Sequence, residues 1–170
     1  LRFSLEDDKL AISRESDTWT DGGAATIRVT MPSPKSVVIA GSGSIKAPTM
    51  ASHADITIVG SGKAAIDTVA ADELDIVIPG SGEVSLSGTA RTLDVTIPGT
   101  GSAKMPDLQV NSADVTIVGS GDVTFASDGT VEATIVGSGD VTVIGDATCE
   151  VKSVGSGNVT CAKVKKDEAD

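Results

Sequence analysis

The stretch from Asp114 to Val123 reads DVTIVGSGDV, and copies of it run through most of the chain. Its marker, Gly-Ser-Gly or once Gly-Thr-Gly, occurs seven times, and the first glycines of successive copies are 18 to 20 residues apart. Repetition at a short, nearly constant period is typical of solenoids, in which each repeat forms one turn of a coil. The marker glycines are Gly41, Gly43, Gly60, Gly62, Gly80, Gly82, Gly99, Gly101, Gly119, Gly121, Gly137, Gly139, Gly155 and Gly157.

The residues on either side of each marker alternate in polarity as a β-strand does. The position two residues before the first glycine is isoleucine in every copy but the last, and the position four residues before it is always Val, Ile or Ala. These side chains are expected to face inward, and the Thr or Val between them to face outward. The alternation resumes after the marker, as in Val123 and Phe125. Each turn is therefore predicted to contain two strands, a glycine corner and a loop side of variable length.

These observations predict an all-β, single-stranded parallel β-helix of about seven turns over residues 37–162. Residues 1–36 lack the marker but contain strand-like runs at Lys9 to Ser13 and Thr26 to Met31. They are expected to form an N-terminal β cap within the same domain, because a solenoid needs covered ends. Residues 163–170 form a charged tail that is expected to fray. The hydroxyls between the paired glycines are expected to bond along the stack, as polar ladders do.

Composition excludes several classes of protein. The net charge of −11 repels a phosphate backbone, so nucleic-acid binding is excluded. The apolar runs are far shorter than the roughly 20 residues that cross a bilayer, so no transmembrane segment is expected. The chain has one Trp, two Phe and no Tyr, which fits a thin core of stacked aliphatic side chains. No charged-then-apolar leader precedes Leu1, so an export signal is expected either to have been removed or to lie outside this sequence.

The repeat has the form D-[VI]-x-[IV]-x-G-S-G-x-[VA] at Asp55 to Ala64, Asp75 to Val84, Asp94 to Ala103 (with Thr100 for the serine) and Asp114 to Val123. It resembles the bacterial family described as "putative auto-transporter adhesin, head GIN domain". Lys9-Leu10-Ala11-Ile12 and Thr26-Ile27-Arg28-Val29 look like the two strands that precede the repeats in that family. The resemblance implies a right-handed β-helix, adhesion, and a periplasmic, outer-membrane or extracellular location in a Gram-negative bacterium. It implies no catalytic residues.

One column of the repeat is acidic. The position five residues before the first glycine holds Ser36 and then Asp55, Asp75, Asp94, Asp114, Glu132 and Glu150. Neighbouring carboxylates about 4.8 Å apart repel by roughly 0.9 kcal/mol in water, a cost that Ca²⁺ or a basic partner would offset. The alternative is that the carboxylates point into solvent or accept hydrogen bonds from nearby Thr hydroxyls and corner amides. The column is a candidate metal site, and no other cofactor is expected.

Cys149 and Cys161 both lie in the last repeat. A disulfide there would close the end of the stack in an oxidising compartment, and the alternative is two small buried thiols.

The expected function is that of a non-enzymatic exported module that contacts a protein or cell-surface partner, with adhesion as the leading role. A periplasmic or cell-envelope module that binds a partner is the alternative. A polysaccharide-binding or polysaccharide-degrading β-helix is less favoured, because the repeats have few aromatic residues and the four arginines of the chain are scattered. Gly-Ser-Gly is not a nucleophile elbow, since no helix follows and His53 is the only histidine. A monomer or weak dimer is expected.

Overall fold

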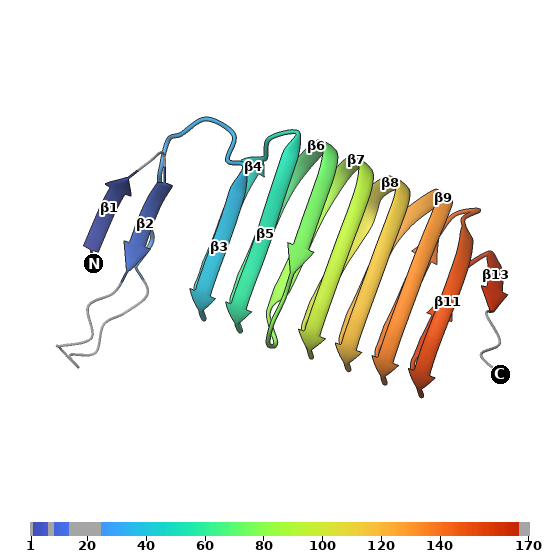
Figure 1. The fold of residues 1–170 in the computed structure, drawn as a ribbon. Helices are drawn as coiled ribbons and strands as arrows, with labels where there is room; N and C mark the ends of the chain where they lie inside the picture. Colours follow the sequence, from blue (N-terminus) through green and yellow to red (C-terminus); the bar gives the residue numbers. More distant parts are fainter. Residues whose placement is uncertain (1, 7–8, 14–24, 167–170) are drawn as a thin grey trace. The chain divides into compact units, whose positions relative to one another are not determined.

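The computed structural model describes residues 2–6, 9–13 and 25–166, and their regular structure consists of β-strands (Figure 1). The chain divides into two compact units, Leu1–Met31 and Pro32–Asp170. The strands are β1 (Arg2–Glu6), β2 (Lys9–Ser13), β3 (Ser36–Gly41), β4 (Ser44–Thr49), β5 (His53–Gly60), β6 (Lys63–Val77), β7 (Glu83–Gly99), β8 (Ser102–Gly119), β9 (Asp122–Gly137), β10 (Asp140–Ile144), β11 (Thr148–Gly155), β12 (Asn158–Thr160) and β13 (Lys163–Lys166). Within these described ranges, no helix has the length and hydropathy needed to cross a bilayer.

The first unit contains an antiparallel hairpin. Strands β1 and β2 pair from Arg2 with Ser13 to Glu6 with Lys9, so the strand predicted at Lys9 to Ser13 is confirmed. The strand predicted at Thr26 to Met31 is wrong: these residues are exposed and have no regular structure. A segment with alternating polarity forms a stable strand when it pairs with another strand, and this segment pairs with no described strand. The cap itself stays a prediction.

The second unit is a parallel β-solenoid of about seven turns, as predicted. Its main ladder follows the order β12-β10-β9-β8-β7-β6-β5-β3, while β4 pairs with β6, and β11 pairs with β9 and β13. Figure 1 shows the strands of successive turns side by side. Equivalent repeat positions are direct neighbours in the ladder, as where Val115 pairs with Val95 on one side and Ala133 on the other. The right-handed sense of the coil stays a prediction.

The predicted loop side is wrong for the central turns. Strands β6 to β9 are 15 to 18 residues long because they continue around a second bend and form a third side of the turn. Ala70 pairs with Thr89, and Thr89 pairs with Gln109, along this side. Inward-facing Ala71, Ala90 and Val110 bury it against the core. Register shifts at the bend hide its alternation from a simple alignment.

The corners explain both glycines of the marker. Gly119 has φ of +133°, and a Cβ there would collide with the carbonyl oxygen of Gly99 in the preceding turn. At Gly121 a Cβ would lie 2.7 Å from Ile97 Cγ2 and 2.8 Å from the Gly101 oxygen. The small residue is therefore required because consecutive turns approach each other closely.

Backbone hydrogen bonds hold the corners together more regularly than the hydroxyls do. The amide of the central Ser or Thr donates to the first glycine of the preceding marker, as in Ser81 N to Gly60 O at 2.8 Å and Ser138 N to Gly119 O at 2.8 Å. The predicted hydroxyl pairing occurs between Ser81 and Thr100, whose oxygens are 3.0 Å apart.

The core is a column of aliphatic side chains. Ile58, Ile78, Ile97, Ile117 and Ile135, two residues before their corners, are fully buried, which confirms the predicted inward face. The end turns are less covered, because only one side of a terminal turn has a neighbouring turn of the solenoid.

The solenoid extends further than the predicted repeats. Residues 163–166, assigned to a fraying tail, form β13, which pairs in parallel with β11 from Thr148–Lys163 to Val151–Lys166. These four residues therefore pair with the edge strand β11, and fraying of the charged tail stays a prediction. Residues 167–170 lie outside the described part of the chain.

Candidate functional site

Three parallel columns of side chains face outward from the strand before each corner. We call this surface the striped face; it comprises residues 36, 38 and 40 and their equivalents in the six later turns. The first column is the acidic ladder: Ser36, Asp55, Asp75, Asp94, Asp114, Glu132 and Glu150. The middle column is Val38, Thr57, Val77, Thr96, Thr116, Thr134 and Lys152, and the apolar column is Ala40, Val59, Pro79, Pro98, Val118, Val136 and Val154.

The strand register brings all members of the acidic ladder together. Each member pairs in the ladder with its equivalent in the next turn, from Ser36 with Asp55 to Glu132 with Glu150. Parallel strands lie about 4.8 Å apart, so the carboxylates are stacked at roughly this spacing.

Desolvation and then like charge raise the pKa of two members. Desolvation raises the pKa of Asp75 above its ordinary 3.8, followed in effect by the charges of Glu73 and of the ladder neighbours Asp55 and Asp94. Desolvation also raises the pKa of Asp114, and the ladder carboxylates on both sides of it add to the shift. The folded state therefore holds part of this column at an electrostatic cost.

The apolar column is exposed over much of its length. Val59 is 47% exposed, Val118 49%, Val136 44% and Val154 70%. Val118 pairs in the ladder with Pro98 and Val136, so the column is continuous across neighbouring turns. A continuous row of apolar side chains beside a row of carboxylates is a more specific surface than scattered exposed valines.

A lysine bridges two rungs of the acidic ladder at its C-terminal end. Lys152, in the middle column, places its Nζ 3.0 Å from Glu132 Oε1 and 3.6 Å from Glu150 Oε1. An ammonium group approaching from the middle column can therefore contact carboxylates of two successive turns.

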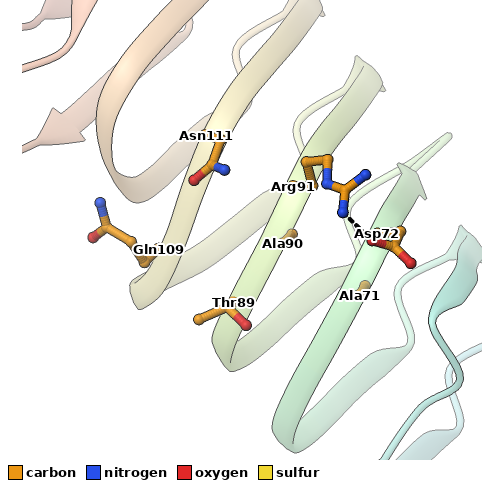
Figure 2. Close-up of a pocket in the computed structure, with 7 residues that line it drawn as sticks. All are labelled: Ala71, Asp72, Thr89, Ala90, Arg91, Gln109 and Asn111. Carbon is orange, nitrogen blue, oxygen red and sulfur yellow. Dashed lines mark ion pairs between the residues drawn. The ribbon is translucent and has the colours of Figure 1, made fainter.

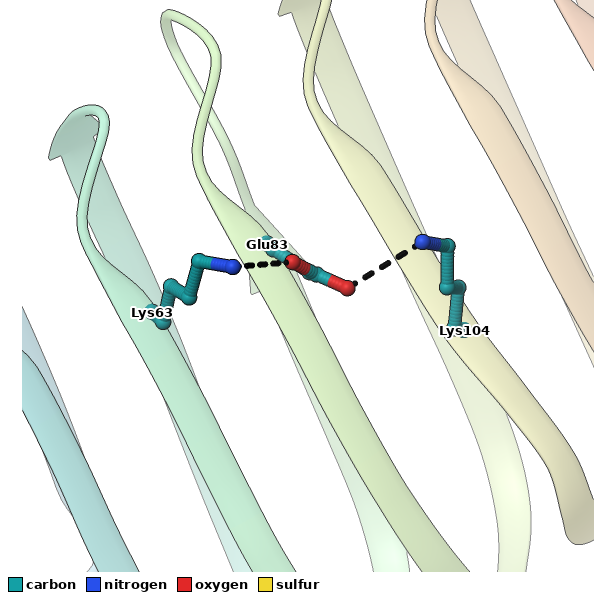
Figure 3. A network of polar contacts seen from close by, with 3 residues as sticks. All are labelled: Lys63, Glu83 and Lys104. Carbon is teal, nitrogen blue, oxygen red and sulfur yellow. Dashed lines mark hydrogen bonds and ion pairs between the residues drawn. The ribbon is translucent and has the colours of Figure 1, made fainter.

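Charges after the corner are arranged differently. Lys63 Nζ lies 2.8 Å from Glu83 Oε2, and Lys104 Nζ lies 3.1 Å from Glu83 Oε1, so one carboxylate sits between two ammonium groups (Figure 3). The hydrogen bonds from Lys63 and Lys104 lower the pKa of Glu83, and the hydrogen bond to Glu83 raises the pKa of Lys63. The charges of this ion-paired cluster compensate one another, whereas in the acidic ladder the lysine contact lies at the C-terminal end, on Glu132 and Glu150.

A shallow hollow of about 240 Å³ lies on the third side of the coil (Figure 2). It is lined by Ala71, Asp72, Thr89, Ala90, Arg91, Gln109 and Asn111. Asp72 is its single carboxylate; Ser52 Oγ donates to Asp72 Oδ2 at 2.8 Å, and Arg91 Nη2 lies 3.0 Å from Asp72 Oδ1. The Ser52 hydrogen bond and then the Arg91 charge lower the pKa of Asp72. Glycoside hydrolysis uses two carboxyl groups, one of them kept protonated, and this hollow does not offer that pair.

A second hollow of about 320 Å³ is lined by Ala65, Ile66, Asp67, Ser85, Leu86, Ser87, Lys104, Pro106 and Asp107. Two of its charged groups are already engaged: Lys104 pairs with Glu83, and Asp67 Oδ1 lies 3.4 Å from Lys46 Nζ. Charged residues in the lining of both hollows therefore take part in ion pairs that span adjacent turns.

The structure lends no geometric support to the metal hypothesis. No three or more His, Cys, Asp or Glu residues among the described positions converge on a point where an ion could bind. A straight ladder spreads its carboxylates along a line, whereas Ca²⁺ takes six to eight oxygens around one point. Calcium binding stays a prediction from the sequence.

The two cysteines are joined. A disulfide links Cys149 to Cys161, with Cα atoms 6.4 Å apart. Cys149 is fully buried and Cys161 packs against the core, so the bridge ties the last turn to the stack.

The sequence-based reading identified the acidic ladder but missed the apolar column and both lysine clusters. The apolar column was visible in the aligned repeats, one residue before each first glycine. The lysine contacts between turns join residues 20 or 21 positions apart, so the repeat period was the signal that could have found them.

The comparison with family models gives one match. The model described as "Putative auto-transporter adhesin, head GIN domain" matches residues 1–147, which include the hairpin and most of the solenoid. Among curated proteins and among solved structures, none matches the chain. Because the match covers well over half of its length, the chain belongs to the auto-transporter adhesin head GIN domain family.

Proposed function

We propose that this chain is a non-enzymatic adhesion module that works outside the cytoplasm and presents its striped face to a partner on another surface. The family description supports an adhesin-like role and an exported or surface location. The observation that carries the proposal is the regularity of the striped face, which repeats one outward pattern in register through seven turns.

A repeated surface suits adhesion because weak contacts add when they are held in fixed geometry. Each of the five rungs from Asp55 to Glu132 offers one carboxylate, one small middle side chain and one apolar side chain, and none of these alone would bind tightly. Seven rungs on one rigid scaffold avoid the ordering cost that a flexible chain would pay for each contact.

The test uses the producing cells and the purified chain together. Intact cells are labelled with an antibody to the chain, and beads coated with the chain are measured for adherence to sibling cells. We expect surface labelling, and adherence that soluble chain competes away. Beads coated with an unrelated acidic protein of similar isoelectric point are the control.

The opposite result has a clear meaning. If intact cells are not labelled while permeabilised cells are, and coated beads do not adhere, the adhesion proposal fails. Crosslinking of the chain to an envelope protein in those same cells would then favour the alternative, a partner-binding module of the cell envelope.

A further inference from the structure

The striped face combines two features that call for the same kind of partner. Its acidic ladder stacks six carboxylates in adjacent turns, and its apolar column leaves valines such as Val118 and Val154 about half exposed or more. A basic ligand alone would leave the valines in water, and an apolar ligand alone would leave the carboxylates uncompensated.

We propose that the striped face binds an amphipathic α-helix of a partner protein, lying along the stack over the middle column with a basic flank on the acidic ladder and an apolar flank on the apolar column. This rests on the proposed function and adds the chemistry of the partner.

Lys152 supplies the charge argument. It occupies the middle column, where the partner helix would lie, and its ammonium contacts Glu132 and Glu150 at 3.0 and 3.6 Å. In the turns before it the middle column holds Thr96, Thr116 and Thr134, which are uncharged and too short to reach across in this way. Basic side chains of a partner would place ammonium groups between Asp75, Asp94 and Asp114 as Lys152 does between the two glutamates.

The dimensions of the face select a helix over an extended strand. The acidic and apolar columns are four residues apart along each strand, or about 13 Å, close to the 10 to 12 Å diameter of a helix with its side chains. Seven rungs span about 29 Å, the length of a helix of about 19 residues. The helical pitch of about 5.4 Å differs from the rung spacing of about 4.8 Å by an amount that flexible lysine side chains absorb. An extended strand parallel to the stack would direct its side chains toward and away from the face and could not reach both columns at once.

A second copy of the chain fits the face less well. Two copies overlapping across the full face would set carboxylates against carboxylates, or carboxylates against valines, depending on the direction of the two-fold axis. The first arrangement adds repulsion to a chain with a net charge of −11, and the second buries charges without partners. A partner of opposite charge avoids both costs.

The experiment measures binding of a synthetic 18-residue peptide of Lys and Leu, arranged so that the two residue types occupy opposite flanks of a helix. Fluorescence anisotropy of the labelled peptide is followed against the full chain at low and physiological salt. A scrambled peptide of the same composition removes the segregated flanks, and a peptide with Glu for Lys reverses the charge. We expect salt-sensitive, saturable binding of the first peptide only, with a gain of helical circular dichroism.

Variants of the chain locate the binding. The triple substitution Asp75→Asn, Asp94→Asn, Asp114→Asn should weaken binding about tenfold, because it removes three exposed ion pairs. The matched control Asp107→Asn, Asp122→Asn, Asp146→Asn changes the net charge equally at exposed positions away from the striped face, and it should leave affinity within about twofold. The pair Val118→Thr, Val136→Thr keeps the β-branched shape and should weaken binding about threefold. Thermal melts confirm that each variant is folded.

Three outcomes would overturn the inference: equal weakening by both triple variants, equal binding of the scrambled peptide, or occupation of the face by a second copy, seen as a dimer that the peptide cannot displace. The bead assay separates this from the proposed function. If beads carrying the striped-face triple variant still adhere like the parent, adhesion stands and the helix-binding face is refuted. If parent beads do not adhere, the adhesion proposal fails whatever the peptide does.

Discussion

The acidic ladder and the ion-paired cluster of Lys63, Glu83 and Lys104 lie on the two sides of the same corners, and they respond oppositely to the same geometry. The pKa values of Asp75 and Asp114 are raised by desolvation and like charge, whereas the pKa of Glu83 is lowered by its two lysines. In a parallel, in-register stack, each residue lies beside the residue at the same position of the neighbouring repeat. A column that repeats one charge is therefore penalised by the register, and a site where opposite charges meet is stabilised by it.

The largest expected effect comes from breaking the register on which both regions depend. Gly121→Ala would place a Cβ 2.7 Å from Ile97 Cγ2 and 2.8 Å from the Gly101 oxygen, and the backbone oxygen cannot move without disturbing the turn before it. We expect a loss of about 3 kcal/mol in unfolding free energy, measured by urea denaturation, as for an overpacked core site.

Gly43→Ala is the matched control for that substitution. Gly43 occupies the same marker position in the first turn, where the nearest atom to an added Cβ is Ile39 Cγ2 at 4.0 Å. We expect Gly43→Ala to leave the unfolding free energy unchanged or to raise it by up to about 1 kcal/mol, because alanine restricts the unfolded chain. Equal losses at Gly43 and Gly121 would show that close approach between turns is not the reason for the second glycine.

The next effect comes from converting the compensated region into an uncompensated one. Glu83→Lys would bring three ammonium groups together in place of two ion pairs. The Glu83 side chain is 32% exposed and its lysine partners are more exposed, so solvent screening limits the expected loss to about 1 kcal/mol. Glu83→Gln should cost about half of that, because it removes the pairs without adding repulsion. Identical stabilities of parent and Glu83→Lys in thermal melts at low salt would contradict this account.

A smaller effect of opposite sign is expected in the acidic ladder. Asp75→Asn with Asp114→Asn removes two stacked carboxylates and should raise the unfolding free energy by about 0.5 to 1 kcal/mol at low salt, since exposed charges at this spacing are partly screened. The gain should shrink in 0.5 M NaCl. Asp107→Asn with Asp146→Asn, at two exposed positions, is the control for net charge. A loss of stability in the ladder variant would mean that those carboxylates make favourable contacts in the fold.

The contributions of these two regions to stability should depend on pH in opposite ways. Asp75 and Asp114 have pKa values above the ordinary 3.8, so the folded state binds their protons more readily than the unfolded state does, and their ionisation lowers stability as pH rises. The gain in unfolding free energy of the Asp75→Asn, Asp114→Asn variant over the parent should therefore be largest at neutral pH and vanish below about pH 3.8.

The pKa of Glu83 is shifted in the opposite direction, so its effect on stability has the opposite dependence on pH. Its pKa lies below the ordinary 4.5, so its contribution to stability is present above that value and is lost as pH falls through the lowered pKa. At neutral pH the Glu83→Gln variant should be less stable than the parent, and the two should converge in acid. Chemical denaturation at a series of pH values measures both differences. Parallel curves for the two variants would contradict the opposite assignments.

Much of the solenoid could be predicted from the repeat. The marker glycines, the inward isoleucines such as Ile117, and the acidic ladder all follow from aligning one period on the next, because a parallel in-register stack places equivalent residues side by side. Thr26 to Met31 could not be placed correctly, since its alternating pattern depends on a pairing partner that the sequence does not specify. The third side of the turn was missed because its bend shifts the register, and strand β13 was missed because a run of charged residues resembles a free tail.

By itself, the sequence determined the period, the corner positions and which side chains face outward, because these depend on local alternation and on glycine at points of close approach. Only the tertiary structure decided which of the outward charged side chains form ion pairs. The bridging of Glu132 and Glu150 by Lys152 and the placing of Glu83 between Lys63 and Lys104 depend on side-chain reach across turns, and so does the distinction between a compensated and an uncompensated column. That distinction is electrostatic and varies with distance and burial, which no linear pattern contains.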